Sequence, residues 1–166
     1  MTTTRLFAAL GITFCVALGV LGLSCKDATL VTDSLEDDPW AVIEYPAGQE
    51  VTTELKPTAL ASDAKGIARV VRSENETTIN LDVTGVTGES TQKVYVVDTS
   101  GNATLLGILT MNEGSGNLVA KTALNKFMIL VSPEATLSTM GPETTMSLRS
   151  TVPSGFTVLP RENVAR

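Results

Sequence analysis

The chain has 166 residues, with 18 acidic and 12 basic side chains, a formal net charge of −6 and no histidine. The missing histidine excludes Ser-His-Asp and Cys-His catalysis, histidine zinc ligands and the usual pH switch. Acidic residues spread along the whole chain also argue against a nucleic-acid partner, because phosphates require clustered Lys and Arg.

The first 25 residues carry the pattern of an export signal. Arg5 supplies one positive charge, Leu6–Leu23 is a long apolar run, and small residues lead to Cys25. A positive start, an apolar middle and small residues at a cleavage point are the three parts of a secretory signal. We therefore expect a hydrophobic signal helix here, and a mature domain that lies outside the cytoplasm.

Residues 21–25, Leu-Gly-Leu-Ser-Cys, resemble the lipobox of a bacterial lipoprotein signal. The resemblance implies that Cys25 is diacylated and becomes the first residue of the mature chain. Gly22 stands where these signals usually carry a large aliphatic residue. Lys26, in place of an aspartate, favours outer-membrane sorting where two membranes exist. An uncleaved membrane helix and a fully released protein are the alternatives.

The next segment, Lys26–Pro39, is acidic, with carboxylates at Asp33, Glu36, Asp37 and Asp38. Runs of like charge are normally solvated and extended, which predicts a tether between anchor and domain. A calcium site is the alternative, because hard cations bind carboxylate oxygens, but no glycine turn arranges these acids in a cage. We expect four parts: a signal peptide (1–24), an acidic tether (25–39), a β-domain (40–160) and a tail (161–166).

The rest of the chain alternates short strand patterns with turn residues. The run Phe127–Val131 is apolar throughout, as in a strand covered on both faces. The glycine-rich stretch Asn112–Asn117 predicts a turn. The pattern predicts an all-β fold, an Ig-like antiparallel β-sandwich. The expected strands are Trp40–Tyr45, Val51–Lys56, Ile67–Ser73, Thr77–Thr84, Lys93–Asp98, Ala103–Met111, Leu118–Leu124, Phe127–Val131, Thr144–Thr151 (with Met146 and Leu148 facing inward) and Phe156–Leu159.

Two features permit a structural and a functional interpretation. Trp40, the single tryptophan, either covers the edge of the core or stacks on a ligand. Asp98, Ser100 and Asn102 have the spacing of a calcium loop, yet Ala103 replaces the turn glycine and Leu109 the final glutamate. Turn chemistry is the better explanation of the second feature.

The block from Lys93 to Arg149 resembles the extracytoplasmic β-domain of anti-sigma-K-type regulators. The stretches that carry the resemblance are Val94–Gly101, Leu106–Leu109, Val131–Glu134 and Met140–Pro142. The resemblance implies a fold and a location. It does not imply sigma-factor binding, because the family's histidine/cysteine zinc motif has no counterpart and four residues precede Arg5.

Cys25 is the one residue to which the sequence assigns a chemical role, as a lipid anchor; we expect no cofactor and no metal. The expected function is a non-enzymatic binding or sensory domain in the bacterial cell envelope, whose partners are the membrane, through the lipid anchor, and an unidentified envelope protein. A structural envelope lipoprotein, or the extracytoplasmic part of an anti-sigma system, is the alternative. An enzyme would need paired carboxylates, and the sequence does not pair Asp82, Asp98 or Glu134. We expect Arg69 and Arg72 to pair with acids at the surface.

Overall fold

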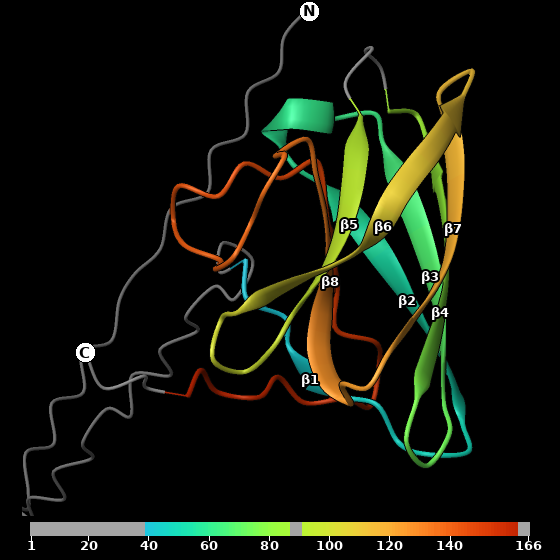
Figure 1. Ribbon diagram of the computed structural model, residues 1–166, viewed down its shortest axis with the longest axis vertical. Coiled ribbons are helices and arrows are strands. Elements are labelled where there is room, and N and C mark those ends of the chain that lie inside the picture. The colour runs from blue at the N-terminus through green and yellow to red at the C-terminus, as the bar shows by residue number, and fades with distance from the viewer. Residues whose placement is uncertain (1–38, 87–90, 163–166) are drawn as a thin grey trace, which may run out of the picture. The chain divides into compact units, whose positions relative to one another are not determined.

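In the computed structural model, residues 39–86 and 91–162 are described. They form nine strands and one short 3₁₀ turn, and Figure 1 shows their arrangement. The elements are β1 (Ile43–Glu44), β2 (Glu50–Pro57), η1 (Ala59–Ala61), β3 (Lys65–Arg72), β4 (Thr77–Thr84), β5 (Gln92–Val97), β6 (Ala103–Asn112), β7 (Ser115–Thr122), β8 (Lys126–Ser132) and β9 (Leu148–Ser150).

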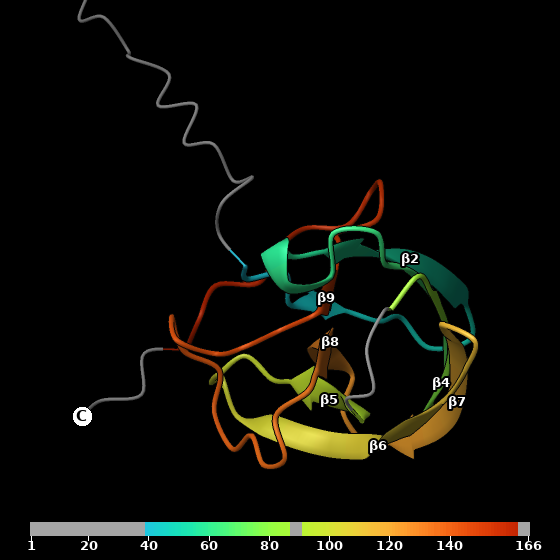
Figure 2. The same ribbon diagram turned by 90° about the horizontal axis from the view of Figure 1, so that it is seen from above.

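The strands from β2 to β9 close into an antiparallel barrel of eight strands. Around the ring their order is β8-β5-β6-β7-β4-β3-β2-β9, and β9 returns to β8. The view from above in Figure 2 shows this ring. Two three-stranded meanders, β2-β3-β4 and β5-β6-β7, are joined where β7 pairs with β4 along the full length of both strands.

The predicted Ig-like sandwich is therefore wrong, although the all-β class is confirmed. A sandwich requires two separate sheets, and here β4–β7 joins the meanders on one side while β9 pairs with both β2 and β8 on the other. Period-two alternation is the same in a sandwich and a barrel, because both bury one face of each strand. The expected signal helix and acidic tether lie outside the described residues.

The barrel interior is filled by apolar side chains from every side of the ring. The register places Val70 on β3 opposite Ile79 on β4, and Val96 on β5 opposite Ile129 on β8, all of them buried. Tyr45 stacks on Phe127 with ring centroids 4.5 Å apart. Small barrels are typically packed in this way.

A second apolar cluster lies on the outer face of β5 and β8. Tyr95, Val97, Met128 and Leu130 point outward there and are covered by residues 40–42 and by side chains between 137 and 159. Every residue of Phe127–Val131 is fully buried. This confirms the prediction of a strand covered on both faces.

The hairpins agree with the sequence predictions, and the first and last segments of the described domain depart from them. Strands β3–β4 and β5–β6 lie where expected. Within 112–117 only Glu113 and Gly114, both with positive φ, form the turn, so β7 begins at Ser115. The expected strand 144–151 shrinks to Leu148–Ser150, and 156–159 is not a strand.

The expected strands are cut short where their residues belong to the outer layer. Strand β1 covers only part of 40–45, and Leu159 donates a single main-chain bond to Val42. Leu148 enters the barrel core as predicted, but Met146 packs against the outer cluster. Segments that pack across a face meet few main-chain partners, and so they do not extend a ladder.

Candidate functional site

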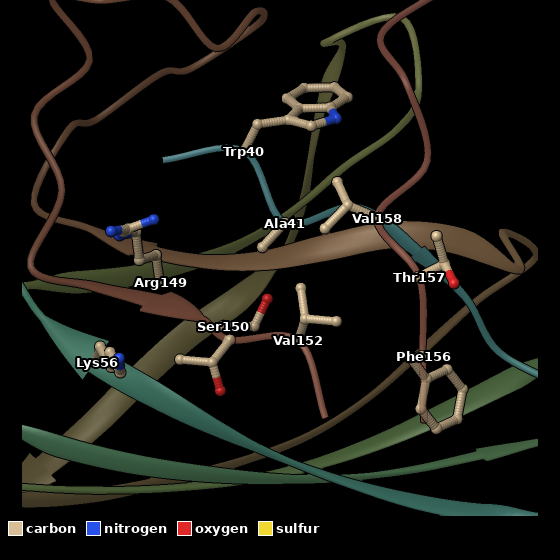
Figure 3. Close-up of a pocket in the computed structure, with 10 residues that line it drawn as sticks. Trp40, Ala41, Lys56, Arg149, Ser150, Val152, Phe156, Thr157 and Val158 are labelled. Atoms are coloured by element: carbon tan, nitrogen blue, oxygen red, sulfur yellow. The ribbon is translucent and has the colours of Figure 1, made fainter. Parts of the chain in front are cut away.

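A pocket of about 680 Å³ lies where the outer layer ends, beside β2 and β9. Figure 3 shows its lining side chains. Volumes of this size are typical of small-molecule sites. The lining residues are Trp40, Ala41, Lys56, Arg149, Ser150, Thr151, Val152, Phe156, Thr157 and Val158.

Two cationic side chains, Lys56 and Arg149, line the barrel side of this pocket. Lys56 on β2 is directly opposite Arg149 on β9 in the antiparallel register. Their strand neighbours Leu55 and Leu148 are buried in the barrel core, so alternation turns both cations outward. Sequence reasoning missed this pair, because the β2–β9 contact joins segments far apart in the chain.

The apolar wall comes from the segment after β9. Val152, Phe156 and Val158 are each half-buried there. The start of the segment is fixed to β2: Thr151 donates its main-chain N–H to the Glu54 carbonyl over 2.8 Å, and its own carbonyl accepts from the Thr53 hydroxyl over 2.7 Å. These bonds hold the wall against the barrel.

Trp40 closes one side of the pocket. Its indole Nε1 donates to the Leu159 carbonyl over 2.8 Å, and the Arg161 guanidinium lies 4.4 Å from the ring centroid. The side chain is 7% exposed. The interpretation of Trp40 as the cover of the core edge is confirmed, and the same side chain also lines the pocket.

The acids that the sequence singled out have separate, local partners. Asp98 accepts hydrogen bonds at Oδ1 from the main chain of Ser100 and Asn102, each over 2.9 Å, which confirms the turn interpretation. Asp82 lies 3.6 Å from Arg69, and Glu134 accepts from the Thr145 N–H over 2.6 Å. Within residues 39–86 and 91–162, no group of three or more His, Cys, Asp or Glu side chains could hold a metal ion.

The expected surface pairing of the two β3 arginines is half confirmed. Arg69 forms the ion pair with Asp82. Arg72 instead donates to the Thr77 hydroxyl over 2.8 Å and to the Leu124 carbonyl over 3.1 Å. Arg72 thereby joins the β3–β4 hairpin to the β7–β8 connection.

The lipidation residue predicted from the sequence, Cys25, lies outside the described residues, as do the tether acids Asp33 and Glu36–Asp38. None of the helices in the described part of the chain is long and apolar enough to cross a membrane.

Comparisons of the chain with models of protein families, with curated proteins and with solved structures found no match.

Proposed function

We propose that the chain is a non-enzymatic, extracytoplasmic binding domain, held at a membrane of the bacterial cell envelope by acyl chains on Cys25. The observation that supports binding is the pocket beside β2 and β9, which combines an apolar wall with two cationic side chains. Ligand sites typically have this composition, mostly apolar with a few polar groups that orient the ligand.

The anchor rests on the sequence of residues 5–25. Each buried methylene contributes about 0.8 kcal/mol to membrane binding, so two or more acyl chains hold a protein where one chain would not. A tether rich in aspartate and glutamate would then keep the barrel away from the bilayer, because its charges repel one another.

The anchor is tested by Cys25→Ser. We expect this variant to lose incorporation of an alkyne-tagged fatty acid and to shift from the membrane fraction to the soluble fraction, or to remain unprocessed at higher mass. Cys15→Ser is the matched control, because Cys15 lies inside the apolar run that would be removed. Unchanged labelling and unchanged fractionation of Cys25→Ser would contradict the lipid anchor.

A further inference from the structure

A second depression, of about 400 Å³, lies where β4, β7 and β6 are neighbours in the ring (Figure 2). We call it the polar groove. Asn117 on β7 is directly opposite Asp82 on β4 and directly opposite Thr110 on β6. The next outward row repeats this arrangement around Ser115. The two rows cross three strands and carry six short polar side chains, which are Asp82, Thr84, Thr110, Asn112, Ser115 and Asn117.

These six side chains point away from the barrel core. Val83 on β4 and Met111 on β6, which lie between the two rows, pack in or against the core cluster, so alternation turns the six outward. All six residues are exposed. Within residues 39–86 and 91–162, Asp82 lies 3.6 Å from Arg69, and the other five side chains form no hydrogen bond or ion pair. Their donors and acceptors can therefore exchange water for the groups of a ligand.

The polar groove offers donors and acceptors at close intervals. A hydroxyl and a side-chain amide each donate and accept hydrogen bonds. Opposite side chains are about 5 Å apart, and successive outward rows are about 7 Å apart. A matching ligand has many donors and acceptors along its length, and it has no net charge because the one charged member, Asp82, already faces Arg69. Neutral saccharides have this chemistry.

An apolar border adjoins the two rows on the side away from the β6–β7 turn. Ile108 on β6 and Val119 on β7 are the next outward residues beyond Thr110 and Asn117, and both are more than half exposed. Methyl groups placed against them would leave water, which is favourable. A saccharide with acetamido groups supplies such methyls, and it supplies amides that fit the side-chain amide of Asn117.

We infer that the polar groove binds a neutral, N-acetylated oligosaccharide. Its hydroxyl and acetamido groups bond to the six polar side chains, and its acetyl methyls lie against Ile108 and Val119. The inference goes beyond the proposed function, because it adds a second site whose residues line no part of the pocket beside β2 and β9.

The first test compares tetra-N-acetylchitotetraose with cellotetraose. Both probes are neutral β-1,4-linked tetrasaccharides, and they differ in carrying an acetamido group or a hydroxyl at C2. The full chain is held in nanodiscs of phosphatidylcholine, and the main-chain N–H groups of Gly116 and Asn117 report on the groove by NMR. We expect saturable shifts with the acetylated probe, and binding of cellotetraose at least about fivefold weaker, the loss expected for one neutral hydrogen bond.

The second test removes single polar groups from the groove. Thr110→Val keeps the shape of the side chain without its hydroxyl, and Asn117→Ala removes the amide. Each should weaken binding of the acetylated probe about fivefold. Thr52→Val is the matched control, because Thr52 is exposed on β2 and does not line the groove. It should leave the affinity unchanged, and all three variants should melt as the parent chain does.

The outcomes judge this site separately from the proposed function. No saturable shift with the acetylated probe, or equal affinity for the two probes, would overturn the inference. Unchanged affinity in either groove variant, or an equal loss in Thr52→Val, would overturn it as well. None of these results bears on the pocket beside β2 and β9, and the anchor is judged independently by labelling of Cys25.

Discussion

Tyr45 is the residue whose ionisation is most strongly tied to folding. Its side chain is 2% exposed and stacks on Phe127. Burial raises the pKa of Tyr45 above its ordinary value of 10.0, because the phenolate would lose its hydration inside the barrel. The pKa of Tyr95 is raised as well, mainly by burial; a main-chain hydrogen bond at Leu137 opposes the rise, and the charge of Glu134 adds to it.

These pKa shifts predict that stability falls at alkaline pH. An acid with a raised folded-state pKa keeps its proton longer in the folded state than in the unfolded state. Its stabilising effect is complete below pH 10 and is lost as the pH rises further, by up to about 1.4 kcal/mol per pH unit for Tyr45. Urea unfolding at pH 8 to 11 should show this decline, and Tyr45→Phe should reduce its slope. Parallel stability curves for the parent and Tyr45→Phe would contradict the prediction.

Single residues of the candidate site were predictable from sequence only where their signal is local. Asp98 was assigned to a turn because the residues that it caps follow within four positions. Trp40 was noticed because it is the single tryptophan. Within its own strand pattern, each of Lys56 and Arg149 is an ordinary outward position. The two residues are brought together only by the register of β2 against β9. No pattern within either strand encodes that register.

At the scale of elements, the barrel is incompletely paired between β6 and β7, although both strands are long. The two strands pair only from Thr110↔Asn117 to the turn, and Figure 1 shows them diverging beyond it. Before Thr110, β6 pairs with β5, whereas β7 pairs with β4 along its whole length. We call the unpaired stretch between β6 and β7 the seam. Along it, Val119 is 67% exposed and Ile108 is 53% exposed.

The seam predicts alternating amide exchange along β7. In a hairpin with a two-residue turn, Ser115 and Asn117 direct their main-chain groups toward β6, so Val119 and Lys121 do the same. The β6–β7 ladder ends before these two residues, whereas Leu118 and Ala120 direct their N–H groups toward β4. By hydrogen exchange, we expect Val119 and Lys121 to exchange at least about tenfold faster than Leu118 and Ala120. Uniform protection along β7 would show that the seam is closed.

Among the elements, the hairpins were predictable and the closure of the barrel was not. Thr77–Thr84 shows both its alternation and its turn within a few residues, and the strand lies where predicted. Barrel closure depends on β9, three residues long, which pairs with β2 and β8. A strand this short has too little alternation to reveal its partners. The local pattern of alternation in the sequence is therefore compatible with a sandwich and with a barrel alike.

At the scale of the whole described domain, its first and last segments complete one layer. Val42 accepts a main-chain hydrogen bond from Leu159, and Trp40 donates its indole N–H to the Leu159 carbonyl. Val158 and Leu159 pack on the cluster that covers β5 and β8. The final segment thus covers the barrel and also forms the apolar wall of the pocket.

Ending the chain after Val152 should therefore uncover part of the outer face of β5 and β8 without removing any strand. Burial of an apolar side chain contributes about 1.5–3 kcal/mol, so losing Val158 and Leu159 should lower the unfolding free energy by about 2 kcal/mol or more. Trp40 would lose both Leu159 and Arg161, and its fluorescence should shift to longer wavelength. Far-UV circular dichroism should retain the strand signal, because β9 ends at Ser150.

A chain that ends after Glu162 is the matched control, because it keeps every contact described for this layer. It should match the parent chain in emission maximum and urea midpoint. If the shorter chain also matched the parent in both, the final segment would not stabilise the barrel.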